Sequence, residues 1–144
     1  MLTYETLLSD CLAASLGKPR TPILVVEDDL GLKMIFEWVI RDLNPLLTFH
    51  WCTSFEQAEE AMKKNQYQLI ISDFLLEGFG NGLDVLGLSS EILPKAKFVM
   101  MSSLRLQDFC RLPEKNEPLL LSKPVNIKKL QDVIRDAICP KEAS

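Results

Sequence analysis

The chain has 144 residues, of which 47% are hydrophobic and 25% charged, and its 16 Lys and Arg against 20 Asp and Glu give a formal net charge of −4. This composition is typical of one globular domain with its own core and excludes a disordered chain. The acidic balance argues against direct nucleic-acid binding, and the longest uncharged stretch, residues 43–55, is too short for membrane insertion.

Residues 1–21 precede the first predicted strand and form a separate N-terminal extension. Apolar side chains recur there every four residues and predict one helix, which a Gly-Lys-Pro sequence at residues 17–19 ends. The recurring side chains are Tyr4, Leu8 and Leu12. The extension carries Glu5 and Asp10 where an export signal needs a basic start and an apolar centre, so we expect a cytoplasmic protein.

Residues 22–139 form the predicted main domain, followed by a short tail at residues 140–144. Short apolar runs predict strands at residues 23–26, 46–52, 68–72, 97–101 and 119–122. Helical spacing and capping residues predict helices at residues 32–43, 54–64, 82–90, 104–112 and 126–138. Five strands alternating with five helices predict an α/β fold, a doubly wound (βα)5 sandwich around a parallel sheet.

Polar side chains follow four of these strands, at the edge where ligands of doubly wound folds bind. They are Glu27, Asp28, Asp29, Asp73, Ser102, Ser103 and Lys123. Carboxylates gathered in this way repel one another and favour a divalent cation that prefers oxygen ligands, usually Mg²⁺. A hydroxyl and an ammonium beside them are groups that hold phosphoryl oxygens. A carboxylate on a central strand can then act as a nucleophile and form an acyl phosphate.

Four short motifs occur in order, each at the end of an apolar strand. They are ILVVEDD at residues 23–29, LIISD at 69–73, FVMMSS at 98–103 and LSKP at 121–124. Together they resemble the receiver domain of the two-component response-regulator family over residues 22–138. The resemblance implies a flavodoxin-like sheet with strand order 2-1-3-4-5. It also implies a phosphorelay signalling protein whose catalysis concerns only its own aspartate.

The same resemblance implies a role for each motif residue. Asp73 is the implied phospho-acceptor, Ser102 the switch hydroxyl, and Lys123 the cation that contacts the phosphoryl group. Mg²⁺ is implied to bind Asp28 directly and Glu27 through water. The remaining implied metal ligands are Asp73 itself and the backbone carbonyl of Leu75.

Three further expectations come from the resemblance. The peptide bond before Pro124 is expected to be cis. Water is expected to attack the acyl phosphate past the side chains of Leu75 and Leu104, which are apolar here, so hydrolysis should be slow. Leu120 occupies the switch position where the family commonly has Tyr or Phe, so we expect no aromatic switching.

The implied partners are a sensor histidine kinase or phosphotransfer protein and an output protein that the sequence does not name. No output domain follows the motifs, so we expect a stand-alone receiver. The loop at residues 74–82 is one residue longer than is usual in the family and lacks the proline that usually lies four places after the acceptor. A phosphorylation-independent receiver-like scaffold is the alternative. An aspartyl phosphatase of the haloacid-dehalogenase type is ranked last, because Glu27 stands where its nucleophile would be.

Other residues receive structural interpretations. Leu30, Met34 and Trp38 lie roughly opposite the buried face of the first main-domain helix, and packing by the N-terminal extension, a homodimer or disorder of that extension remain open explanations. His50 lies within a strand and is interpreted as a surface or packed residue. Widely spaced cysteines with one histidine predict reduced thiols, not a zinc site or disulfides. They are Cys11, Cys52, Cys110 and Cys139.

Overall fold

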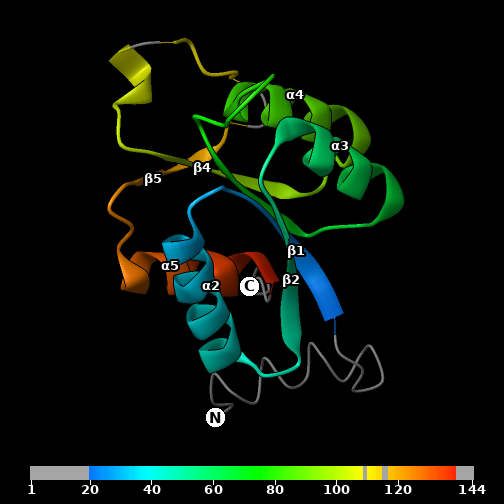
Figure 1. Cartoon of the computed structure of the whole chain (residues 1–144), viewed down its shortest axis with the longest axis vertical. Coiled ribbons are helices and arrows are strands. Elements are labelled where there is room, and N and C mark those ends of the chain that lie inside the picture. The colour runs from blue at the N-terminus through cyan, green and yellow to red at the C-terminus, as the bar shows by residue number, and fades with distance from the viewer. Residues whose placement is uncertain (1–19, 109, 115–116, 139–144) are drawn as a thin grey trace, which may run out of the picture.

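The computed structural model describes residues 20–108, 110–114 and 117–138, so the predicted N-terminal helix, Cys11, Cys139 and the tail lie outside the described residues. Five strands form one parallel sheet in the spatial order β2-β1-β3-β4-β5 (Figure 1). Their bounds are β1 (Arg20–Val26), β2 (Leu47–Cys52), β3 (Leu69–Asp73), β4 (Lys97–Ser102) and β5 (Leu119–Ser122). The predicted α/β fold and the strand order implied by the resemblance are confirmed.

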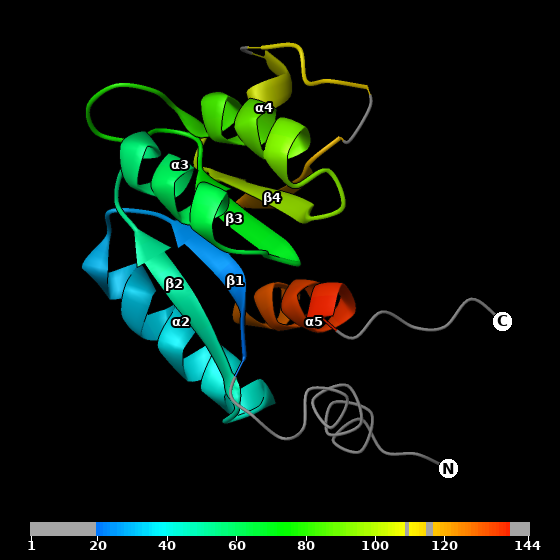
Figure 2. The ribbon, with the colours of Figure 1, turned by 90° about the vertical axis from the view of Figure 1, so that its right-hand side faces the viewer.

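Helices cover both faces of the sheet, with α2 and α5 on one side and α3 and α4 on the other (Figure 2). In the described part of the chain the α-helices are α2 (Leu30–Leu43), α3 (Phe55–Lys64), α4 (Gly82–Ile92) and α5 (Ile127–Ile138). Successive side chains of β1 alternate between the two cores, since Ile23 and Val25 face α2 and α5 while Leu24 and Val26 face the other pair. Burial on both faces explains why the central strands are continuous apolar runs.

A polar cap begins each of these α-helices in the loop that follows the carboxyl end of a strand. The Asp29 side chain accepts the Gly31 N–H at 2.8 Å to begin α2, and Ser54 accepts the Gln57 N–H at 3.3 Å to begin α3. Asn81 forms a full capping box with Asp84 at the start of α4, and Asn126 accepts the Lys129 N–H before α5. Every strand-to-helix loop that carries a candidate residue is therefore anchored at the same edge of the sheet.

The helix predicted at residues 104–112 is wrong. Only a single 3₁₀ turn, η1 (Leu106–Asp108), forms between β4 and β5. Leu106 is the one fully buried side chain among the described residues of that range, whereas a helix lying on a sheet buries several. With so little burial to stabilise it, and with Pro113 disfavouring helical geometry in the preceding residue, so short a helix is not stable.

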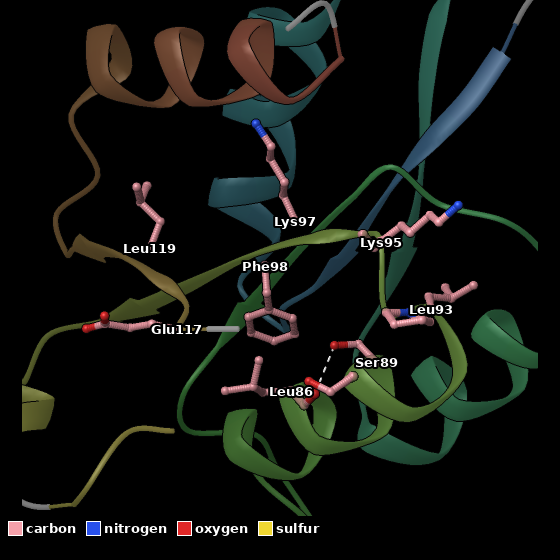
Figure 3. A pocket seen from close by; sticks show the side chains of 11 residues that line it. Leu86, Ser89, Leu93, Lys95, Lys97, Phe98, Glu117 and Leu119 are labelled. Atoms are coloured by element: carbon pink, nitrogen blue, oxygen red, sulfur yellow. Dashed lines mark hydrogen bonds between the residues drawn. The ribbon is translucent and has the colours of Figure 1, made fainter. Parts of the chain in front are cut away.

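A hollow of about 370 Å³ lies between α4, the beginning of β4 and β5 (Figure 3). Leu86, Phe98 and Glu117 are among its lining residues. It is near the amino end of β4, and the candidate residues follow the carboxyl ends of the strands. The hollow is therefore separate from the candidate site.

The structure describes three of the residues that were interpreted as surface or packed residues without a role in the site, namely His50, Cys52 and Cys110. His50 is exposed on β2, with its Nδ1 2.6 Å from the hydroxyl of Tyr67. Cys52 is buried and Cys110 half-buried, and both are free thiols. Among the described residues, no helix combines the length and the apolar character that crossing a membrane requires.

Gly82 lies directly against the end of β3, and its substitution tests this packing. A Cβ at this position would clash with Met100 Sδ and lie 2.7 Å from the backbone oxygen of Asp73. We expect Gly82→Ala to lower the free energy of unfolding by about 2 kcal/mol, measured by urea denaturation, because the close-packed backbone must shift. Gly87→Ala in the same helix is the control. A Cβ there meets nothing within 4 Å, so it should stabilise the protein by about 0.5 kcal/mol. Equal effects of the two substitutions would contradict the account.

Candidate functional site

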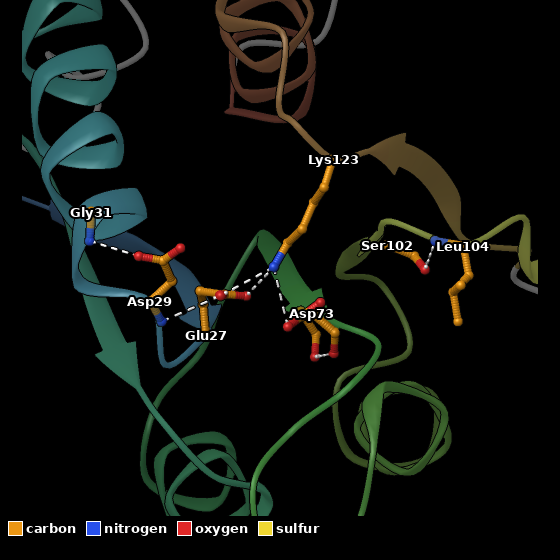
Figure 4. Close-up of polar contacts among 8 residues, drawn as sticks. Glu27, Asp29, Gly31, Asp73, Ser102, Leu104 and Lys123 are labelled. Carbon is orange, nitrogen blue, oxygen red and sulfur yellow. Dashed lines mark hydrogen bonds and ion pairs between the residues drawn. The ribbon is translucent and has the colours of Figure 1, made fainter.

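The carboxyl ends of four strands bring the predicted site residues to one edge of the sheet. Glu27 follows β1, Asp73 ends β3, Ser102 ends β4 and Lys123 follows β5. In Figure 4 the side chains of Glu27, Asp73 and Lys123 point toward one another from these separate elements. The gathering of these side chains follows from the topology, because parallel strands in register end together.

Backbone hydrogen bonds continue past the last strand pairs and hold these residues in place. The Glu27 N–H donates to the Cys52 carbonyl at 2.8 Å, and the Lys123 N–H donates to the Ser102 carbonyl at 2.9 Å. The Phe74 N–H, next after Asp73, donates to the Met101 carbonyl at 2.9 Å. The backbone of each site residue is thus fixed by a neighbouring strand, so their side chains converge without depending on a mobile loop. The Lys123–Pro124 peptide bond is cis.

Lys123 joins two buried carboxylates. Its Nζ lies 3.1 Å from both carboxylate oxygens of Glu27 and 3.2 Å from Oδ2 of Asp73. Glu27 is only 1% exposed, and Asp73 is also buried. A buried carboxylate is stable only when a charge or hydrogen-bond donor compensates it, and the ammonium of Lys123 supplies both.

Burial and mutual repulsion shift the proton affinity of this group. Burial, followed by the charge of Asp73, raises the pKa of Glu27 to about 7, against the opposing effect of Lys123. Burial alone would lower the pKa of Lys123, but the carboxylates of Glu27 and Asp73 outweigh it and raise that pKa. Lys123 therefore stays positively charged at neutral pH, and its ammonium holds the carboxylates of Glu27 and Asp73 close to each other.

Asp28 completes an acidic cluster with Glu27 and Asp73. The three residues offer carboxylate oxygens that all lie within 4.8 Å of one another. Three carboxylates face one ammonium, which leaves an excess of negative charge when they are ionised. The donor set is entirely oxygen, which suits a hard divalent cation such as Mg²⁺. Asp29 is engaged elsewhere, because its side chain caps α2.

Ser102 is buried at the end of β4, and its hydroxyl has a local partner. Its Oγ accepts the backbone N–H of Leu104 at 2.9 Å, and Figure 4 shows this pair apart from the ion pair of Lys123. The hydroxyl thus stabilises the turn that leads into residues 103–118.

The loop after Asp73 extends over residues 74–81 and is closed by the Gly82 N–H, which donates to the Phe74 carbonyl at 2.8 Å. Gly78 and Gly80 adopt positive φ angles of 80° and 90°, a backbone conformation that favours glycine. The side chains of Leu75 and Leu104 are both exposed, on loops that follow the ends of β3 and β4.

Two features of the site were missed by sequence reasoning. The contact of Lys123 with Glu27 joins residues 96 positions apart, and no local pattern signals it. The second is Gly82, which was predicted only as the first residue of a helix and in fact permits close contact with the backbone of Asp73. A glycine directly after a capping asparagine is the sequence signal that could have indicated this close contact.

Comparison with known proteins gives a consistent result. A family model described as response regulator receiver domain matches residues 23–135, and no curated protein sequence matches the chain. A response regulator receiver protein from Sinorhizobium medicae is 21% identical with a TM-score of 0.69, covering 82% of this chain and 94% of its own. A non-phosphorylated receiver domain from Leptospira biflexa is 23% identical with a TM-score of 0.68, covering 87% and 99%.

A third solved structure carries a metal. It is the receiver domain of a sensor histidine kinase from Pseudomonas aeruginosa, with a magnesium ion coordinated in its active-site cleft. It is 19% identical to this chain with a TM-score of 0.65, and the match covers 81% of this chain and 95% of the other. At these identities the likeness to solved structures shows a shared fold.

Proposed function

The chain belongs to the response regulator receiver family, and on this basis we propose that it accepts a phosphoryl group on Asp73 in a Mg²⁺-dependent reaction and then changes its binding to another protein. One observation carries the proposal. Asp73 ends a central strand with Lys123 Nζ 3.2 Å away, within an acidic cluster that includes Asp28. The proposed receiver domain spans residues 22–139, with residues 1–21 as an extension and 140–144 as a tail.

The proposed donor is a phosphohistidine of a sensor histidine kinase or phosphotransfer protein. A carboxylate oxygen of Asp73 attacks phosphorus, the P–N bond to the donor imidazole breaks, and the imidazole nitrogen keeps the electron pair. The product is an acyl phosphate on Asp73. The chain alters only its own aspartate in this reaction, as expected of a signalling domain.

The proposed metal ligands are Asp28, Asp73 and the Leu75 backbone carbonyl, with Glu27 binding through water. Their support is the all-oxygen cluster and the magnesium ion in the related receiver domain from Pseudomonas aeruginosa. When bound, the ion supplies positive charge that offsets the repulsion between Asp73 and an incoming phosphoryl group. The ammonium of Lys123 is close enough to Asp73 to pair with the oxygens of that group once it is attached.

The proposed switch is the Ser102 hydroxyl. To reach a phosphoryl oxygen, the side chain rotates about its Cα–Cβ bond, which carries Oγ away from the N–H of Leu104, and the turn into residues 103–118 loses its anchor. Leu120 lies on β5 without a hydroxyl or an aromatic ring, so no rotation of an aromatic side chain accompanies the movement of this segment. The presence of the acceptor, lysine, hydroxyl and acidic pair together favours this function over a scaffold that needs no phosphorylation.

The first prediction concerns the acceptor. With Mg²⁺ and acetyl phosphate, the native chain should gain one phosphoryl group by intact mass, and Asp73→Asn should gain none because the nucleophile is lost. Asp28→Ala should reduce labelling by about tenfold or more through loss of a metal ligand. Asp29→Asn is the matched control, since it removes a neighbouring charge but keeps the cap of α2, and it should label like the native chain. Full labelling of Asp73→Asn would rule out the proposal.

A second prediction concerns the lifetime of the phosphoryl group. The side chains of Leu75 and Leu104 are 60% and 41% exposed, and they offer an attacking water no hydrogen-bond partner. We expect Leu75→Asn and Leu104→Glu each to hasten dephosphorylation about tenfold, equivalent to about 1.4 kcal/mol in the barrier. Decay is followed by intact mass without a phosphatase. Phe79→Asn, at a position in the same loop that is 78% exposed, should leave the decay unchanged. Unaltered decay in both leucine variants would refute the proposal that these two apolar side chains slow hydrolysis.

The third prediction follows the switch. Phosphorylation should speed hydrogen exchange at the Leu104 amide about tenfold, because the Ser102 hydroxyl no longer accepts it. Ser102→Ala should show the faster exchange without phosphorylation, whereas amides of α2 serve as an unaffected reference. An exchange response limited to α2, with Leu104 unchanged, is the outcome that the proposed switch does not allow.

A further inference from the structure

Helix α2 carries large apolar side chains on both of its sides. Phe36, Val39 and Ile40 are buried against the sheet. On the outer side, Leu30, Met34 and Trp38 are 69%, 71% and 57% exposed. These three, the outer row, repeat every four residues and extend over about 12 Å of the helix. A continuous row of this kind differs from the scattered apolar residues of an ordinary surface and indicates a docking face.

The N-terminal extension joins the domain beside this helix. β1 begins at Arg20, whose N–H donates to the Leu46 carbonyl at 3.0 Å. Leu46 follows the end of α2 by only three residues. Residues 1–19 therefore connect to the domain next to the carboxyl end of α2, within reach of the outer row.

The extension has a matching apolar pattern. Tyr4, Leu8 and Leu12, the N-terminal row, also repeat every four residues, so in a helix they extend over about the same 12 Å. Thr6 and Asp10 fall on the opposite side of such a helix. The Gly-Lys-Pro sequence at residues 17–19 provides a break at which the chain can reverse direction before β1.

We propose that residues 4–16 form a helix that packs parallel to α2, with the N-terminal row against the outer row. The short connection places Leu12 near Trp38 and Tyr4 near Leu30. Because Leu30 follows Asp28 by two residues, the docked helix borders the acidic cluster.

The helix proposed for residues 4–16 fits the outer row of α2 better than a second copy of the chain does. The outer row offers on the order of 400 Å², about half of what each partner contributes to a typical stable interface. A segment tethered by three residues acts at an effective concentration in the millimolar range or above, so a small apolar contact suffices. The tether and the limited area together favour the chain's own extension.

Hydrogen exchange of the full chain tests the proposal directly. Amides of residues 4–16 should exchange about tenfold more slowly in the native chain than in Leu8→Asp, which puts a charge into the N-terminal row. Thr6→Asp introduces the same charge on the opposite side and should keep the protection. Exchange of residues 4–16 in the native chain at the rate of an unstructured peptide would overturn the proposal.

Tryptophan quenching provides a second measurement on the other side of the contact. The chain has two tryptophans, so Trp51→Phe leaves Trp38 as the only reporter. In this background Leu8→Asp should increase acrylamide quenching about twofold, because the indole regains the area that the helix covered, and Thr6→Asp should not. Sedimentation of the native chain should give a monomer. A dimer whose dissociation on dilution uncovers Trp38 would assign the face to a second copy and refute the proposal.

Discussion

The buried carboxylates of Glu27 and Asp73 and the single ammonium of Lys123 form the interaction on which the rest of the site depends. Removing ionised carboxylates from water costs several kcal/mol each, and Lys123 offsets this cost only because it reaches both within about 3 Å. The parallel sheet makes the contact possible by ending three strands at one edge. Fold and site are therefore linked by electrostatics as well as by packing.

The same arrangement leaves the cluster short of positive charge. With Asp28 included, three carboxylates face one lysine, and the pKa of Glu27 is raised to about 7 by burial and by the charge of Asp73. A divalent cation and a phosphoryl group would each find complementary groups here, the cation among the carboxylates and the phosphoryl oxygens at Lys123. The observed contacts are consistent with a resting site in which Lys123 supplies the only compensating cation among the described residues.

Much of this fold was predictable from local sequence pattern. The strands are continuous apolar runs because both faces of the sheet are covered, and each site residue directly follows one of them, as Asp73 follows β3. The segment before Pro113 was not predictable in this way. Its apolar residues suggested a helix, but only Leu106 is buried in the structure and a single 3₁₀ turn forms instead. The contact of Lys123 with Glu27 was also not predictable from local sequence pattern, because it depends on the tertiary geometry of the assembled sheet.

In the proposed function, Asp73, Lys123 and the acidic cluster together bind a metal ion and a phosphoryl group. A crystal structure of the chain with Mg²⁺ and beryllofluoride, a tetrahedral stand-in for the phosphoryl group, tests it most directly. We expect beryllofluoride bonded to Asp73, Mg²⁺ bound by the carboxylates of Asp28 and Asp73, and the Lys123 ammonium moved from Glu27 to a fluoride. An adduct at another residue, or an unmodified Asp73 with Lys123 still bridging both carboxylates under saturating conditions, would contradict it.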